Sequence, residues 1–254
     1  MDGVAVPELA IFLLATFAAA LVAGLAGFAF GLVAAAAWLH ILTPTETAAL
    51  IIAFGLIVQG FAVWKLRRAL DLRRLWPFLA GGALGVPLGV ALLEVARPGA
   101  LRTGIGVLLV AYAIHALARP ALPPARNAGA GADAGIGFLS GILGGATGLG
   151  GILPTIWCGL RDWPADVQRA VFQPVAVAIF LLSALWLGAK GDISARTIEL
   201  FLLGLAPLLA GTWIGWRLYG RLDPPGFRRI VLLLLLASGT ALILEMLAST
   251  PKSG

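Results

Sequence analysis

The chain has 254 residues, of which 60% are hydrophobic and only 12% are charged, and its mean hydropathy is +0.99. A soluble domain carries about 25% charged residues, so this chain cannot cover a water-facing surface, and we expect it to lie in a lipid bilayer. Its formal net charge is +6, but the Lys and Arg residues lie almost entirely between apolar runs, where lipid headgroups explain them, and this excludes nucleic acid as a partner.

Eight apolar runs are long enough to cross a membrane, which requires about 20 helical residues. The start of the chain lacks the basic region of a cleavable signal peptide, so the first run is expected to remain as a span. All eight Trp lie within about two turns of a predicted span end, where an aromatic belt forms. In chain order the runs cover residues 9–39, 44–64, 75–95, 100–118, 134–160, 168–189, 197–218 and 227–248.

The first and fifth runs carry glycine strings of matching pattern. In the fifth run, five glycines and a proline occur within the eleven residues 144–154. That density does not suit a continuous helix, so we expect spans one and five to be broken or re-entrant. Close helix packing through small residues is the alternative explanation. At a shift of 117 positions, Gly24, Gly27 and Gly31 match Gly141, Gly144 and Gly148.

A Pro/Gly/Ala-rich linker at residues 119–133 divides the chain into two predicted repeats, 1–118 and 134–254. Gly85 and Gly89 match Gly211 and Gly215 at a shift of 126 positions. We therefore expect an all-α integral membrane protein with eight transmembrane helices in two four-helix repeats. Four spans per repeat make the repeats parallel, related by an axis along the membrane normal. The basic residues of 65–74 favour cytoplasmic termini, whereas Arg217, Arg221, Arg228 and Arg229 favour the reverse orientation.

A break in the fifth span exposes a helix N-terminus, whose free N–H groups and positive dipole suit an anion. Arg169 and Gln173 lie one turn apart on one helical face and could add donors to an oxyanion. Equally, Arg169 could extend to the lipid headgroups and pair with an aspartate. Gln59 could serve merely to hold helices together by hydrogen bonding. The predicted substrate-binding residues are Arg169, Gln173, Thr147, Gly144, Gly145, Gly148, Gly150, Gly151, Gly27, Gly31 and Gln59.

The chain has few residues that could take part in catalysis. The chain has only two His, His40 and His115, and one Cys, Cys158, with no clustered carboxylates within the spans. These residues assemble neither a metal site nor a nucleophile–base pair, and no ATP-binding motif is present. We expect no enzymatic activity and no cofactor. Transport would then run down a gradient or with a coupling ion, a proton or sodium.

Two stretches carry a resemblance to a known family. They are Gly141-xx-Gly144-Gly145-xx-Gly148-x-Gly150-Gly151-xx-Pro154 and Gln168-Arg-Ala-Val-Phe-Gln-Pro174. With the duplicated halves, they make the whole chain similar to the sulfite exporter TauE/SafE family of membrane permeases. Residues 31–37 read Gly-Leu-Val-Ala-Ala-Ala-Ala and depart from the Gly-Gly-Gly run and proline of that family. The resemblance implies export or uptake of small sulfur-containing anions, such as sulfite, sulfoacetate or other organosulfonates, across the bacterial inner membrane.

We therefore expect a secondary carrier that binds its anion near mid-membrane, between the breaks of spans one and five. Alternating access would come from rocking one four-span half against the other. A passive anion channel and a non-transporting scaffold, with glycines used for packing, are the alternatives. Small residues on helices that face lipid would permit a homodimer.

Overall fold

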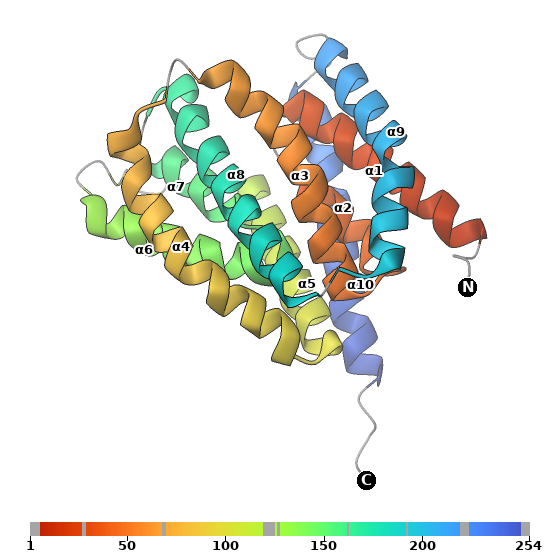
Figure 1. The fold of residues 1–254 in the computed structure, drawn as a ribbon. Coiled ribbons are helices and arrows are strands. Elements are labelled where there is room, and N and C mark those ends of the chain that lie inside the picture. Colours follow the sequence, from red (N-terminus) through yellow and green to blue (C-terminus); the bar gives the residue numbers. More distant parts are fainter. Residues whose placement is uncertain are drawn as a thin grey trace. The chain divides into compact units, whose positions relative to one another are not determined.

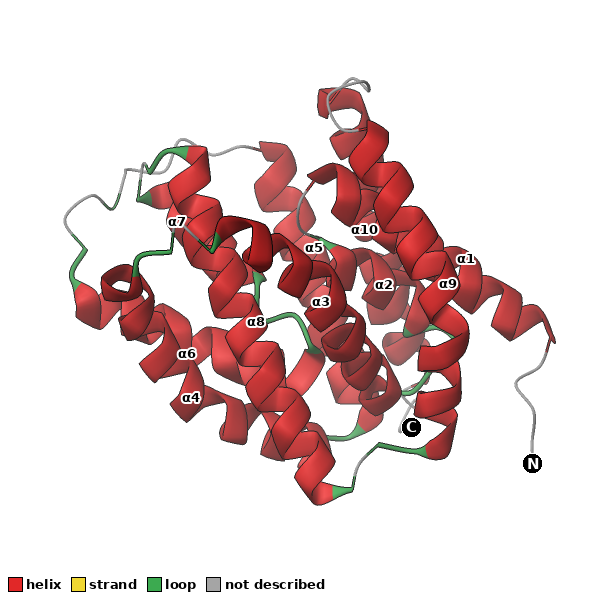
Figure 2. Cartoon of the chain, turned by 45° about the horizontal axis from the view of Figure 1, so that its top comes forward, coloured by secondary structure: helices red, strands yellow, loops and turns green. Residues whose placement is uncertain are grey.

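The computed structural model describes residues 6–26, 29–67, 70–118, 125, 128–161, 163–191, 193–218 and 224–249. Within these residues the chain forms ten α-helices and no strand (Figures 1 and 2). In order, the helices are α1 Val6–Ala26, α2 Phe30–Trp38, α3 Pro44–Leu66, α4 Leu72–Val95, α5 Pro98–Ala118, α6 Ala130–Thr147, α7 Ile152–Leu160, α8 Ala165–Lys190, α9 Ala195–Leu218 and α10 Pro224–Ser249.

Seven of the described helices are long and apolar enough to cross a membrane. They correspond to seven of the eight predicted spans. The run 134–160 is the exception, because α6 and α7 share it and neither is among the seven. The seven segments are Val6–Leu25, Pro44–Trp64, Leu72–Val95, Pro98–Ala118, Asp166–Lys190, Ala195–Leu218 and Val231–Ala248.

The two runs with glycine strings are each divided between two helices. In the first run α1 ends at Ala26 and α2 begins at Phe30, and in the fifth α6 ends at Thr147 and α7 begins at Ile152. A left-handed residue lies at each division: Ala29 has φ 77° and ψ 4°, and Gly148 has φ 73° and ψ 4°. A left-handed residue ends the hydrogen-bond ladder of a right-handed helix.

The helices form two compact units, and each unit takes helices from both predicted repeats. Unit 1 contains Met1–Thr47, Ala96–Pro120 and Leu203–Gly254. Unit 2 contains Ala48–Val95 and Ala121–Leu202.

In unit 2, α4 packs against α6 through a stripe of glycines on each helix. Gly81, Gly85 and Gly89 are four residues apart on α4, as are Gly137, Gly141 and Gly145 on α6. A Cβ at Gly141 would lie 2.5 Å from the Gly82 carbonyl oxygen, and one at Gly145 would lie 2.6 Å from the Val86 carbonyl oxygen. The backbones approach this closely only because the side chains are absent, as in glycine-mediated packing of membrane helices.

In unit 1, two helix pairs also pack closely through glycine. A Cβ at Gly24 of α1 would lie 2.6 Å from the Thr212 carbonyl oxygen of α9. A Cβ at Gly106 of α5 would lie 2.9 Å from the Gly239 carbonyl oxygen of α10. Close packing, which was the alternative explanation of the glycines, therefore accounts for many of them.

A second face of α4, beside the glycine stripe, shows which solvent the helix meets. Leu84, Leu88 and Leu92 follow one another at four-residue intervals and are 70%, 54% and 44% exposed. Leu202, Trp213 and Leu234 are similarly exposed on α9 and α10. A continuous apolar face of this kind is favourable against lipid chains and unfavourable against water.

Candidate functional site

The connection between α6 and α7 is built by its glycines and one proline. Gly148, at the C-terminal end of α6, donates its N–H to Gly144 at 2.8 Å and then turns the chain with its positive φ. Residues 148–150 are buried. Pro154 is the third residue of α7, where a helix has no internal acceptor for the N–H that proline lacks. The proline is therefore compatible with a helix that starts at Ile152.

Several backbone N–H groups at the start of α7 have no acceptor among the residues that the structure describes. Ile152 donates its N–H to the Leu149 carbonyl, and Thr155 donates to that of Gly151, both at 3.2 Å. Within the described part of the chain, no acceptor meets the N–H groups of Gly150, Gly151 and Leu153. The N-cap residue provides no side-chain acceptor, and the first turn of α7 has no acidic residue. This helix end therefore presents unpaired donors and the positive end of a helix dipole.

Helix α8 lies beside this helix start. A Cβ at Gly151 would lie 3.4 Å from the Ala176 Cβ, and one at Gly150 would lie 2.8 Å from Ile179 Cγ2. Gln173 precedes Ala176 by three residues, so it lies on the same face one turn away. It is only 4% exposed. The fold thus brings Gln173 close to the start of α7.

Arg169 lies farther along α8. It precedes Ala176 by seven residues, about 10 Å along the helix axis. Its side chain is half-buried, and no other described residue forms a hydrogen bond or ion pair with it. The predicted face of Arg169 and Gln173 is therefore present, with Gln173 nearer to the start of α7.

The hydroxyl of Thr147 is used locally. Its Oγ1 donates to the Leu143 carbonyl at 2.7 Å and accepts the Leu149 N–H at 3.2 Å. The hydroxyl proton points back into α6, so this side chain stabilises the helix end.

The remaining predicted site residues are dispersed. Gly144 faces Ile179 of α8, Gly145 faces α4, and a Cβ at Gly148 would lie 2.8 Å from Ile51 Cγ2 of α3. Gln59 is a half-buried residue of α3, and no other described residue forms a hydrogen bond with it. Gly31 lies in the first turn of α2, in unit 1. Gly27 lies outside the described residues.

A buried polar cluster fixes the far end of α7. The indole N–H of Trp157 donates to Asp133 Oδ1 at 2.7 Å, and Arg161 Nη2 lies 3.7 Å from Asp133 Oδ2. Arg161 also donates to the carbonyl oxygens of Ala125 and Ala128. The linker and the first turn of α6 are thus tied to the end of α7.

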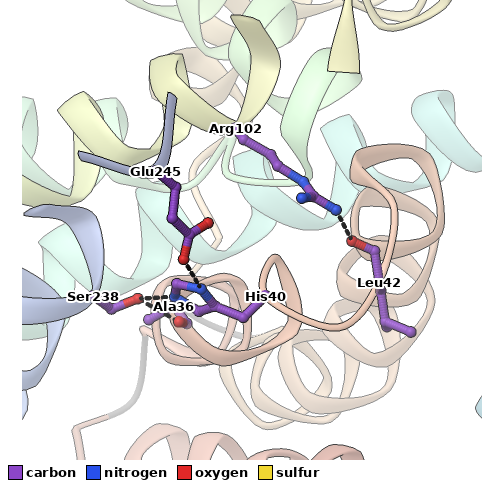
Figure 3. A network of polar contacts seen from close by, with 6 residues as sticks. All are labelled: Ala36, His40, Leu42, Arg102, Ser238 and Glu245. Atoms are coloured by element: carbon purple, nitrogen blue, oxygen red, sulfur yellow. Dashed lines mark hydrogen bonds and ion pairs between the residues drawn. The ribbon is translucent and has the colours of Figure 1, made fainter. Parts of the chain in front are cut away.

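A second polar network, in unit 1, was not predicted from the sequence. It joins His40, in the turn after α2, to Ser238 and Glu245 of α10 (Figure 3). His40 is separated by 198 positions from Ser238 and by 205 positions from Glu245. No local sequence pattern can therefore indicate the contact.

The exposed apolar faces and the seven membrane-length helices of the described residues define a multi-pass membrane protein. The family model of the sulfite exporter TauE/SafE matches residues 12–242, and the chain belongs to this family of membrane transporters. The family is one of transporters and not of enzymes. No curated protein and no solved structure matches the chain.

Proposed function

We propose that this transporter is a secondary carrier of small sulfur-containing anions, such as sulfite, sulfoacetate or other organosulfonates, across the bacterial inner membrane. The observation that carries the proposal is the start of α7, where the N–H groups of Gly150, Gly151 and Leu153 have no acceptor among the described residues. An anionic oxygen would accept these N–H groups and interact favourably with the helix dipole.

Side chains of α8 would complete the site. Gln173 would contribute amide donors one turn from the start of α7. Arg169 would contribute a long-range positive charge, since its guanidinium keeps its charge at any working pH. A sulfonate has three oxygens and would use more of these donors than a carboxylate would.

The divided runs are part of the same proposal. We take α1 with α2, and α6 with α7, to be two broken spans in duplicated halves. The packing supports this duplication, because α1 contacts α9 through Gly24 as α6 contacts α4 through Gly141. Under the predicted repeat, Gly24 is equivalent to Gly141, and α9 is equivalent to α4.

Counterflow in proteoliposomes tests the proposal. Vesicles loaded with unlabelled sulfite, sulfoacetate or acetate receive a trace of the labelled anion outside. A carrier gives a transient overshoot of label with a saturable initial rate, and we expect it for the sulfur anions and not for acetate. A passive anion channel would give label entry without an overshoot. Uptake no greater than in empty vesicles for both sulfur anions would overturn the substrate assignment.

A further inference from the structure

His40 makes two hydrogen bonds to α10 through its two ring nitrogens. Nδ1 lies 3.1 Å from Glu245 Oε1, and Nε2 lies 3.2 Å from Ser238 Oγ. Figure 3 shows the imidazole ring between these two side chains. Ser238 and Glu245 are seven residues apart, two turns along one face of α10.

The hydroxyl proton of Ser238 is already committed. Ser238 Oγ donates to the carbonyl oxygen of Ala36 in the last turn of α2. That carbonyl is available because the His40 backbone N–H bonds to Ala37 at 3.3 Å. Ser238 can therefore only accept from the ring, so Nε2 of His40 must carry a hydrogen.

The second ring nitrogen then requires one more proton. A hydrogen bond between Nδ1 and Glu245 Oε1 exists if the proton is on the ring, as imidazolium with carboxylate, or on the acid, as neutral imidazole with carboxyl. Without that proton, a nitrogen lone pair faces a carboxylate, and the contact becomes repulsive. The network thus holds a single exchangeable proton whichever atom carries it.

The proton site stands in the turn after α2, and neither of its two ionisable side chains is fully buried. The side chains of His40 and Glu245 are 30% and 56% exposed. Two other side chains of opposite charge form hydrogen bonds with residues of this turn. Arg102 of α5 donates to the Leu42 carbonyl at 3.1 Å, and Glu46 of α3 accepts from the Thr43 hydroxyl at 2.9 Å.

We propose that His40 and Glu245 form a proton-binding site, and that the proton bound there couples anion transport to a proton gradient. Binding adds the Glu245 contact to the bonds that Ser238 of α10 makes with Ala36 and His40, and release removes that one contact. The chemistry is the transfer of one proton between water and the pair, with no other bond formed or broken. This inference rests on the proposed carrier function and names its coupling ion.

Proton movement and anion movement can be measured in the same proteoliposomes. A pH-sensitive dye trapped inside reports protons, and labelled anion reports transport, with whichever of sulfite and sulfoacetate gives the larger counterflow. The quantity of interest is the number of protons moved per anion. We expect wild-type protein to move protons only when the anion is added.

Two variants remove the exchangeable proton while keeping amide hydrogen bonding, Glu245→Gln and His40→Gln. We expect each to lower the number of protons moved per anion at least fivefold. His115→Gln, which replaces the other histidine, is the control and should leave the ratio unchanged.

The outcomes separate the two proposals. Absence of counterflow in the wild type overturns the carrier and, with it, the coupling. Counterflow without anion-dependent proton movement in the wild type overturns the proton site alone. An unchanged ratio in either variant also overturns the assignment to His40 and Glu245.

Discussion

Trp157 and Asp133 are joined by a hydrogen bond of 2.7 Å that links the last turns of α7 to the first turn of α6. Arg161 approaches the other oxygen of the same carboxylate. The side chains of Arg161 and Asp133 are only 12% and 10% exposed, so water cannot replace a missing partner. The cluster holds α7 at the end opposite to its free N–H groups.

Asp133→Ala should therefore destabilise the protein strongly. It leaves a nearly buried guanidinium and an indole N–H unpaired, which costs about 3 kcal/mol or more. Asp133→Asn keeps an acceptor for Trp157 and loses the ion pair, so its stability should be intermediate. Thermal unfolding in detergent measures the order wild type, Asn, Ala. Equal stability of Ala and wild type would show that the cluster is not structurally important.

Gly141→Ala should weaken the contact between α4 and α6. The new Cβ would lie 2.5 Å from a backbone oxygen, that of Gly82, and backbone cannot move aside as a flexible side chain can. Overpacking of this kind costs about 1–3 kcal/mol. The matched control is Gly135→Ala on the same helix, where the added Cβ meets nothing within 4 Å. Alanine there should be neutral or stabilising by up to about 1 kcal/mol, because it favours the helix. Similar melting temperatures for the two variants would contradict the packing argument.

Substitutions at the two left-handed residues should change the stability of the protein in opposite directions. Gly148→Ala places a side chain at φ 73°, which costs roughly 1–2 kcal/mol, and brings its Cβ 2.8 Å from Ile51 Cγ2. Ala29→Gly removes the same strain at φ 77° and should stabilise the protein by roughly 0.5–1 kcal/mol. Melting temperatures of the purified variants test both. Loss of stability in Ala29→Gly would argue against a left-handed residue there.

Gln173→Ala should weaken anion binding. A hydrogen bond to a charged group contributes about 1.5–3 kcal/mol, so we expect the dissociation constant to rise roughly ten- to hundredfold. Arg169→Ala should weaken binding less, because Arg169 lies two turns from the residue that contacts Gly151. The dissociation constant can be measured by anion-induced thermal stabilisation of the purified protein.

Arg73→Ala is the control for the loss of a positive charge in unit 2. Arg73 is exposed in the first turn of α4, so its removal should leave anion affinity as in the wild type. If Arg73→Ala and Arg169→Ala weakened binding equally, the effect would reflect net charge and not a site.

The sequence predicted most helices well because apolar runs set the length of a membrane helix. The predicted span 44–64 is α3 Pro44–Leu66, and 197–218 is α9 Ala195–Leu218. The glycine density of 144–154 indicated an interruption, and α6 ends within it, at Thr147, whereas a single broken span formed by α6 and α7 stays a prediction. Such features are local, so the residues themselves carry them.

Partner choice was not predictable in the same way. The sequence treats Gly144 and Gly145 as neighbours in one string, but they face different helices, α8 and α4. The role of Thr147 likewise depends on the rotamer that directs its hydroxyl to Leu143. His40 meets Glu245 only because α2 and α10 share unit 1. These facts depend on tertiary packing, which helical periodicity does not encode.

The interleaved composition of the two units has a consequence for biosynthesis. Unit 2 is complete in sequence at Leu202, whereas unit 1 requires Leu203–Gly254. Helices α1 and α5 therefore leave the ribosome long before α9 and α10, which supply the facing glycines. During that interval the exposed small-residue faces of α1 and α5 must be shielded by the translocon or by lipid, and a chain that terminates early would present them to membrane proteases.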